Sequence, residues 1–130
     1  PDMALTTGDG NVAIRRSSDG HFRLTATVDG NPVRFLVDTG ASLVALSPGD
    51  ARAIGFDTDR LQYGLRIQTA NGTAWSAAVS LAEISVGTIR ARNVRAAVSQ
   101  SGLSESLLGL AFLNRLSGYE VRGDTMILKP

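Results

Sequence analysis

One acidic residue in this 130-residue chain stands where an apolar strand would end and a tight loop would begin. The apolar run Phe35-Leu36-Val37 leads directly into Asp38, and the small or hydroxyl-bearing residues Thr39-Gly40-Ala41-Ser42 follow it. Gly40 lets the backbone turn tightly, since glycine has no Cβ to restrict it. The apolar residues beside the loop would anchor its ends in a core. The pattern therefore predicts one carboxylate held in place at the end of a strand.

Two carboxylates held in this way could hydrolyse an amide bond. Like charges in close contact cannot both ionise, so the pair shares one proton. The ionised member takes a proton from a water molecule, while the protonated member polarises the carbonyl group of the bond to be broken. The chain has one such loop, and Glu83, Glu105 and Glu120 lie near polar or turn positions and are interpreted as surface residues. We therefore expect the second carboxylate to be Asp38 of another copy, across a two-fold axis.

Composition excludes several other kinds of site. The chain has no cysteine and one histidine, His21. It can therefore form no disulfide, no thiolate nucleophile, no cysteine-based zinc site and, within one chain, no Ser-His-Asp triad or multi-histidine metal site. Thirteen basic and twelve acidic residues give a net charge of +1, and the basic residues are scattered rather than gathered in the stripe typical of a nucleic-acid-binding protein. We expect no metal, no organic cofactor and no nucleic-acid partner.

Short strand patterns separated by turn signals dominate the chain. Residues 22–28 alternate between apolar and polar side chains, which is the period of a half-buried strand. Asp29-Gly30-Asn31 is a hairpin signal, and residues 33–37 return from it to deliver Asp38. A second hairpin signal is Asn71-Gly72. The remaining expected strands are an edge strand at residues 12–14 and strands at residues 43–46, 61–69, 73–81, 84–86, 89–98, 119–122 and 125–128.

Two short helices are expected between these strands. Ser47 suits an N-cap and Pro48 the first helical position, and this helix would end near Gly55. Residues 111–116 are the second candidate. Residues 1–11 are rich in Asp, Thr and Gly and are interpreted as a loose arm. These patterns predict an all-β fold, mainly β with one or two short helices, of barrel or sandwich type.

The motifs together resemble those of the retropepsin-like, or retroviral-type, aspartic proteases. The matching elements are Val37-Asp38-Thr39-Gly40-Ala41-Ser42, the hairpin Thr69-Ala70-Asn71-Gly72-Thr73 and Leu107-Leu108-Gly109, in the order of the family and near its spacing. The chain looks closest to the bacterial single-domain members, in which stretches similar to residues 20–22, 34–41, 46–48 and 112–116 also recur. The resemblance covers residues 20–130, which we interpret as the protease domain, preceded by an N-terminal arm over residues 1–19.

The resemblance implies a role for each matching segment. The fold would be a retropepsin-like acid protease barrel that is active as a homodimer, with Asp38 as the catalytic residue. Thr39 would lock the two loops together across the dimer, and Gly40 would contact the substrate backbone. Leu107-Leu108-Gly109 would pack behind the loop as its support. The substrate-binding flap that closes over a peptide would comprise Thr69, Ala70, Asn71, Gly72, Thr73 and Trp75.

Three of these loop and flap positions carry further expectations. Ser42 either lines a substrate pocket or is a structural hydroxyl. Trp75 is interpreted as a packing residue in preference to a substrate contact, because tryptophan is buried to a large extent on average. Ala41 stands where the family has a Ser or Thr that supports the outer oxygen of the catalytic carboxylate. Loss of a hydrogen bond to the ionised form favours the protonated form, so we predict a pH optimum nearer neutral than that of a gastric-type enzyme.

The residues and the resemblance together indicate an aspartic endopeptidase that cleaves an extended polypeptide substrate. Residues 125–129, together with residues 12–14, would interleave across the dimer axis. The alternative is a catalytically silent retropepsin-like module that binds peptides or dimerises, and a third is a domain whose dimerisation needs a segment upstream of Pro1. No apolar run is long enough to span a bilayer. The bacterial members imply an upstream membrane anchor and a location on the periplasmic face of the inner membrane.

Overall fold

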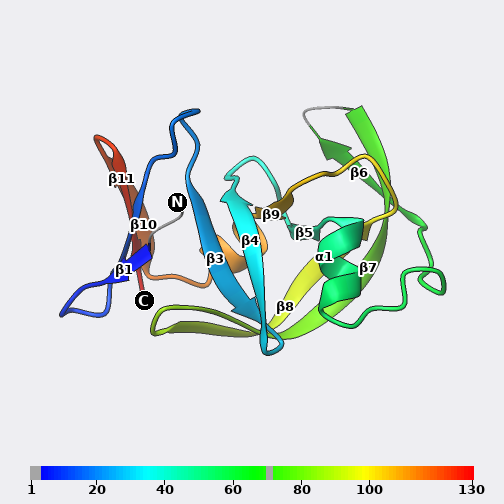
Figure 1. Cartoon of the computed structure of the whole chain (residues 1–130), viewed down its shortest axis with the longest axis horizontal. Helices are drawn as coiled ribbons and strands as arrows, with labels where there is room; N and C mark the ends of the chain where they lie inside the picture. Colours follow the sequence, from blue (N-terminus) through cyan, green and yellow to red (C-terminus); the bar gives the residue numbers. More distant parts are fainter. Residues whose placement is uncertain (1–3, 70–71) are drawn as a thin grey trace.

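Strands make up most of the computed structural model, which describes residues 4–69 and 72–130 (Figure 1). The strands are β1 (Ala4–Thr6), β2 (Val12–Arg15), β3 (Arg23–Val28), β4 (Asn31–Val37), β5 (Val44–Leu46), β6 (Leu65–Thr69), β7 (Gly72–Val86), β8 (Ile89–Ser99), β9 (Ser106–Leu108), β10 (Gly118–Arg122) and β11 (Thr125–Lys129), and the helices are α1 (Pro48–Ala53) and α2 (Leu110–Leu113). One sheet has the order β1-β2-β11-β10 and the other β3-β4-β9-β5-β8-β7-β6. Since β3 also pairs with β7, the larger sheet closes as a barrel. The predicted all-β barrel with short helices is confirmed.

Alternating apolar residues build this barrel around an aliphatic core. In β3 every second side chain from Leu24 to Val28 is buried, and in β4 Val33 and Phe35 point into the same core. Full burial of one such Val, Leu or Phe side chain stabilises the fold by roughly 1.5–3 kcal/mol. The hairpin of β3 and β4 therefore has a fixed place in the barrel, and its second strand ends directly before Asp38.

Strand β9 is the main element that the sequence did not predict. It lies between β4 and β5 and pairs with β4 in parallel, with Leu36 opposite Leu107 and Val37 opposite Leu108. Parallel strands require a long connection, and here β5, both long strands of the β7–β8 hairpin and α1 intervene in the sequence. The pairing places the segment Leu107-Leu108-Gly109 beside the end of β4.

The two ends of the described chain share one sheet, which corrects three expectations. Residues 4–6 form β1, so the loose arm expected over residues 1–11 is wrong for this part. Residues 12–15 form β2, which lies between β1 and β11 and is not an edge strand. β11 pairs with β2 on one side and β10 on the other within the same chain, so these two strands do not remain free to interleave with a partner. The boundary between residues 19 and 20 stays a prediction.

The helices and the remaining hairpins follow their local signals with shifted ends. Ser47 caps α1 by accepting a hydrogen bond from the Asp50 N–H at 3.2 Å, and the chain leaves the helix at Gly55 with φ 111°. α2 starts one residue earlier and ends three earlier than expected. β7 is continuous from Gly72 to Val86 and pairs with β8 in a long hairpin that curves beneath the barrel in Figure 1. No helix in the described ranges is long and apolar enough to cross a membrane.

Candidate active site

Asp38 follows directly on the last residue of β4 and is held by three backbone hydrogen bonds. Its own N–H donates to the Leu108 carbonyl at 3.1 Å, and its carbonyl accepts from the Ala41 N–H at 3.2 Å. Its carboxylate Oδ1 accepts from the Gly40 N–H at 2.9 Å. The side chain remains partly exposed. The carboxylate is therefore both fixed in orientation and accessible to water.

Behind Asp38 the loop packs on Gly109 so closely that no larger residue fits there. A Cβ atom at position 109 would lie 2.3 Å from the Leu43 carbonyl oxygen and 2.4 Å from that of Ala41. Real Cβ atoms do not approach oxygen this closely, so a side chain would displace the loop. The predicted supporting segment, Leu107-Leu108-Gly109, thus contacts the loop through its glycine and through the Leu108 carbonyl.

The first N–H groups of α2 hold the far side of the same loop. The Leu110 N–H donates to the Ala41 carbonyl and the Ala111 N–H to the Ser42 carbonyl, both at 2.8 Å. Such N–H groups have no partner inside a helix, and the loop carbonyls satisfy them. The side chains of Thr39 and Ser42 are exposed, and within residues 4–69 and 72–130 neither hydroxyl forms a hydrogen bond.

A buried polar network, which the sequence did not predict, joins β9 to α1. The Ser106 side chain is fully buried, and its hydroxyl donates to Asp50 Oδ2 at 2.5 Å. The Ser106 hydroxyl oxygen in turn accepts from the Ser47 N–H at 2.9 Å. Because Ser47 also caps α1 through Asp50, the start of the helix and the start of β9 are fixed together. The supporting strand of the Asp38 loop is thereby anchored at both ends.

Arg23 ties the segment before β9 to the turn before β3. Its guanidinium forms ion pairs with Glu105 at 2.5 Å and with Asp19 at 2.8 Å. The hydrogen bond from Arg23 holds the pKa of Asp19 well below its usual range, and the hydrogen bonds to Asp19 and Glu105 raise the pKa of Arg23. Glu105 thus lies at the surface with its side chain 30% exposed, and its carboxylate forms an ion pair that the sequence did not predict.

The predicted flap is the hairpin of β6 and β7. Thr69 pairs with Gly72, and the Thr73 hydroxyl donates to the Gln68 side-chain oxygen at 3.1 Å. β7 begins at Gly72, one residue earlier than expected. Ala70 and Asn71 lie outside the described residues. At the base of the hairpin, the Gln100 N–H donates to the Trp75 carbonyl at 2.9 Å, which links the flap to the segment that follows β8.

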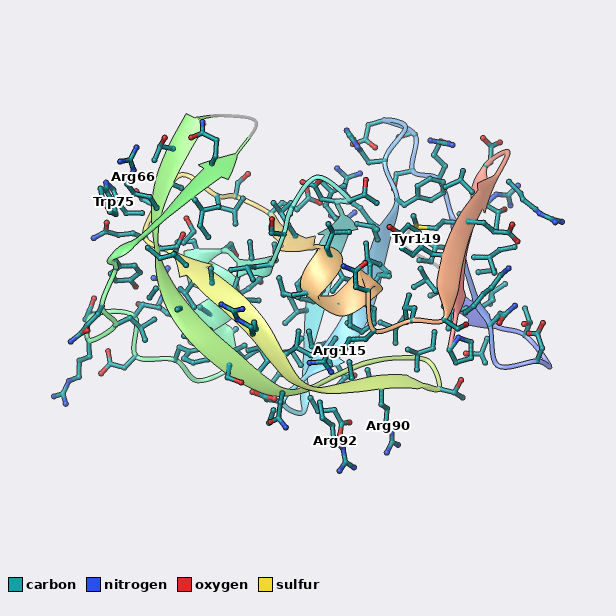
Figure 2. The ribbon with its side chains drawn as sticks, turned by 180° about the vertical axis from the view of Figure 1, so that it is seen from behind. Arg66, Trp75, Arg90, Arg92, Arg115 and Tyr119 are labelled. Atoms are coloured by element: carbon teal, nitrogen blue, oxygen red, sulfur yellow. The ribbon has the colours of Figure 1, made fainter. Side chains whose placement is uncertain are left out.

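Trp75 lies on the outer side of this hairpin, next to Arg66 (Figure 2). The two residues are directly opposite in the strand register, and the guanidinium lies 5.9 Å from the ring centroid. The side chain of Trp75 is 49% exposed. It contacts Arg66 in this structure but is more exposed than expected of a packing residue, and a substrate contact stays a prediction.

Comparison with known proteins agrees with this geometry. A family model described as a gag-polyprotein putative aspartyl protease matches residues 24–115, which is more than half of the chain. The chain belongs to this aspartyl protease family. As a family member it carries one Asp-Thr-Gly loop, Asp38-Thr39-Gly40, and the loop lies at the end of a barrel strand.

Two curated relatives show the family likeness in their sequences. An uncharacterised protein of a Sinorhizobium species is 45% identical over 123 residues, and one of Rickettsia prowazekii is 38% identical over 128 residues. The matches cover 94% and 98% of this chain but 53% and 55% of the relatives, so the chain spans about half the length of these curated relatives.

The solved structures that this chain resembles include a bacterial protease. A retropepsin-like aspartic protease from Rickettsia conorii superposes with a TM-score of 0.84 at 35% identity, over 98% of this chain and 94% of that one. The EIAV protease, solved with an inhibitor, gives a TM-score of 0.63 at 18% identity over 82% and 97% of the two chains, which shows a shared fold alone. The predicted retropepsin-like fold of this aspartyl protease family member is confirmed.

Proposed function

We propose that the chain is an aspartic endopeptidase that cleaves extended polypeptides as a homodimer. The observation that carries the proposal is the Asp38 carboxylate, which is partly exposed, oriented by the Gly40 N–H and present once per chain. Family membership supports the chemistry, since the family model is that of an aspartyl protease. A second carboxylate is then needed to share a proton with the first, and a two-fold axis would supply it.

The reaction would proceed through water. The ionised Asp38 takes a proton from a water molecule while the water oxygen bonds to the carbonyl carbon of the peptide. The protonated Asp38 of the other copy gives its proton to the carbonyl oxygen. The tetrahedral intermediate then breaks its C–N bond: the departing nitrogen takes a proton from one carboxyl group, and a hydroxyl of the intermediate gives its proton to the other carboxylate. The products are a carboxylic acid and an amine, and the pair again holds one proton. The fixed loop would hold both carboxylates in place, so that no reorganisation is required during the reaction.

The state of the Thr39 hydroxyl is an argument for a dimer. It is exposed, and within the described part of the chain it has no hydrogen-bond partner. Directly beside the catalytic carboxylate, such a group is placed to bond with the loop of a second copy. The intrachain pairing of β2 and β11 means that strand pairing between copies through the terminal sheet would use β1 or β10, its two outer strands.

The flap and the loop would bind the substrate between them. An extended peptide can pair its main chain with strand-like edges, and the alternate side chains then enter pockets that give selectivity. The hairpin of β6 and β7 continues beyond the closed barrel, because among the described strands β6 pairs with β7 alone. It would therefore close over a peptide and exclude water.

One observation favours the alternative of a catalytically silent module that binds peptides. The strands expected to interleave across the dimer axis are paired within the chain, which removes the expected dimer contact. A domain that stays monomeric would hold one carboxylate and could still capture an extended peptide. The two functions differ in the fate of the peptide, and a single experiment separates them.

That experiment incubates an unstructured peptide library with the wild type and with Asp38→Asn, from about pH 3 to about pH 8, around and above the usual range of a carboxyl group. The proposal predicts cleavage by the wild type and none by the variant, which retains the shape of the side chain but cannot ionise. Peptides retained intact by both proteins would favour the silent module. Equal cleavage by both would show that Asp38 is not the catalytic residue.

We also propose that the domain faces the periplasm, which rests on the resemblance to bacterial members. A fusion of the gene product with a reporter enzyme that is active only outside the cytoplasm tests this. We expect the fusion to show reporter activity. A fusion that is produced but shows no reporter activity would contradict the proposal.

A further inference from the structure

Strand β10 forms one outer edge of the terminal sheet and carries two exposed large apolar side chains. Tyr119 is 36% exposed and Val121 is 50% exposed. Among the described strands β10 pairs with β11 alone, so its other edge is open. An open edge presents backbone N–H and C=O groups that can pair with a strand of another chain.

Both side chains lie on the buried face of the terminal sheet. Tyr119 is directly opposite Leu128 and Val121 is directly opposite Met126, and residues opposite each other in a sheet share a face. Leu128 and Met126 belong to the buried core of the barrel. Figure 2 shows Tyr119 on the side of β10 that faces the rest of the molecule. The apolar face that covers the core thus continues onto β10, where it is left uncovered.

The opposite edge of the sheet, β1, lacks these features. On the buried face it presents only Ala4 and Thr6, while its Leu5 lies opposite Ala13 on the outer face. β1 is three residues long and β10 is five. A very short edge strand is one way in which natural sheets avoid pairing with other chains. The edge that is suited to a partner is therefore β10.

We propose that β10 pairs antiparallel with β10 of a second copy, with Val121 opposite the partner's Val121. The inference rests on the homodimer of the proposed function and names the strand that would form its contact. In this register Glu120 of each copy lies opposite Arg122 of the other, so the two-fold axis brings together two pairs of opposite charges. The registers centred on Glu120 or on Arg122 would place like charges directly opposite each other, which is destabilising.

This pairing would place both barrels on the same side of one joined sheet. A two-fold axis between antiparallel neighbours of a sheet runs perpendicular to the sheet, so the two copies keep their buried faces on one side. Tyr119 and Val121 of both copies would then be covered between the barrels. Glu120 forms ion pairs with Arg122 and Lys129, both at 3.5 Å, on the outer face, so these charges stay apart from the apolar contact.

Charge reversal tests the pairing through the oligomeric state, measured by sedimentation equilibrium. Glu120→Arg and Arg122→Glu each place like charges opposite each other in a homodimer. An equimolar mixture of these two variants again places unlike charges opposite each other, between chains. Glu83→Arg and Arg92→Glu, alone and mixed, are the matched controls, because they reverse the ion pair of the β7–β8 hairpin with the same changes in net charge. Thermal melting shows that all four variants are folded.

We expect the wild type to sediment as a dimer and each β10 variant to raise the dissociation constant about tenfold or more. The mixture of the two β10 variants should return to within about threefold of the wild type, and the controls should change by less than about twofold. A monomeric wild type would overturn the inference. So would β10 variants that remain dimeric, or a mixture that does not recover, because β10 would then not pair in this register.

Peptidase activity in the same samples separates this inference from the proposed function. We expect the activity to fall in each β10 variant and to return in their mixture. β10 variants that remain dimeric and cleave peptides would overturn the inference and leave the proposed function intact. A wild type that meets every sedimentation criterion but cleaves no peptide would overturn the proposed function and leave the inference intact.

Discussion

The Asp38 loop and the flap hairpin are held in opposite ways. The backbone of the loop is held from behind by the barrel, since β9, Gly109 and the first N–H groups of α2 all contact it. The flap extends beyond the barrel, is paired along one strand only and exposes half of the Trp75 side chain. A carboxylate that must meet a second one needs a fixed position, whereas a segment that must admit a peptide needs freedom to move. On the proposed function, the fold would thus combine a held catalytic loop with a hairpin that the barrel restrains less.

The largest effect is expected where the loop contacts its support. Gly109→Ala places a Cβ atom against two carbonyl oxygens, so either the Asp38 loop or β9 must move. We expect a loss of about 3 kcal/mol or more in the free energy of unfolding, measured by urea denaturation. Gly49→Ala is the matched control, because position 49 lies in α1 with open space around it. Equal stabilities of the two variants would show that the loop is not tightly held.

A smaller loss is expected from the buried network that anchors β9. Ser106→Ala leaves the Ser47 N–H and the Asp50 carboxylate without their shared partner. An unsatisfied buried polar group costs about 1–3 kcal/mol, and denaturation should show this loss in the free energy of unfolding. Ser104→Ala, at an exposed position two residues earlier, is the control and should change little. If Ser106→Ala left the free energy of unfolding unchanged, the network would not contribute to the rigidity of the loop.

The flap should tolerate truncation far better. Trp75→Ala removes a half-exposed ring and its contact with Arg66, worth about 0.5–1 kcal/mol for an exposed cation–π pair. We therefore expect the free energy of unfolding to fall by about 1 kcal/mol or less, with a calorimetric melt as the measurement. If the loss instead matched that of Gly109→Ala, the flap would be as rigidly integrated as the loop.

The smallest effect concerns the ion pair of Asp19 with Arg23, and it depends on pH. The folded-state pKa of Asp19 is depressed, so its contribution to stability is present above its unfolded value of about 3.9 and is lost as pH falls through the lower folded value. Asp19→Asn should therefore lower the melting temperature slightly at neutral pH, and the difference between the two proteins should shrink progressively as the pH falls from the unfolded value toward the lower folded value. A difference that stays constant across this range would assign the effect to something other than charge.

Local signals predicted much of the fold and the position of the Asp38 loop. Ser47 and Pro48 marked α1, and the Asp29-Gly30 turn placed β3 and β4, because caps and turns depend on neighbouring residues. Strand β9 was missed because its parallel pairing with β4 joins distant segments and its three residues follow a polar loop.

The same reason explains why the sequence did not predict several contacts around the site. The hydroxyl of Ser106 meets Asp50 across 56 positions, and Glu105 meets Arg23 across 82, so only the closed barrel brings these pairs together. The place of β2 between β1 and β11 likewise depends on the opposite end of the chain. Short patterns carry no information on such pairings.

The central claim is that two Asp38 carboxylates, one from each of two chains, form one active site. Mixing wild type with Asp38→Asn, unfolding and refolding them together, and measuring peptidase activity at constant total protein tests it most directly. Since only dimers with two wild-type chains would be active, activity should fall with the square of the wild-type fraction, to about a quarter in an equal mixture. A linear fall, to half in an equal mixture, would contradict the claim, because each chain would then act alone.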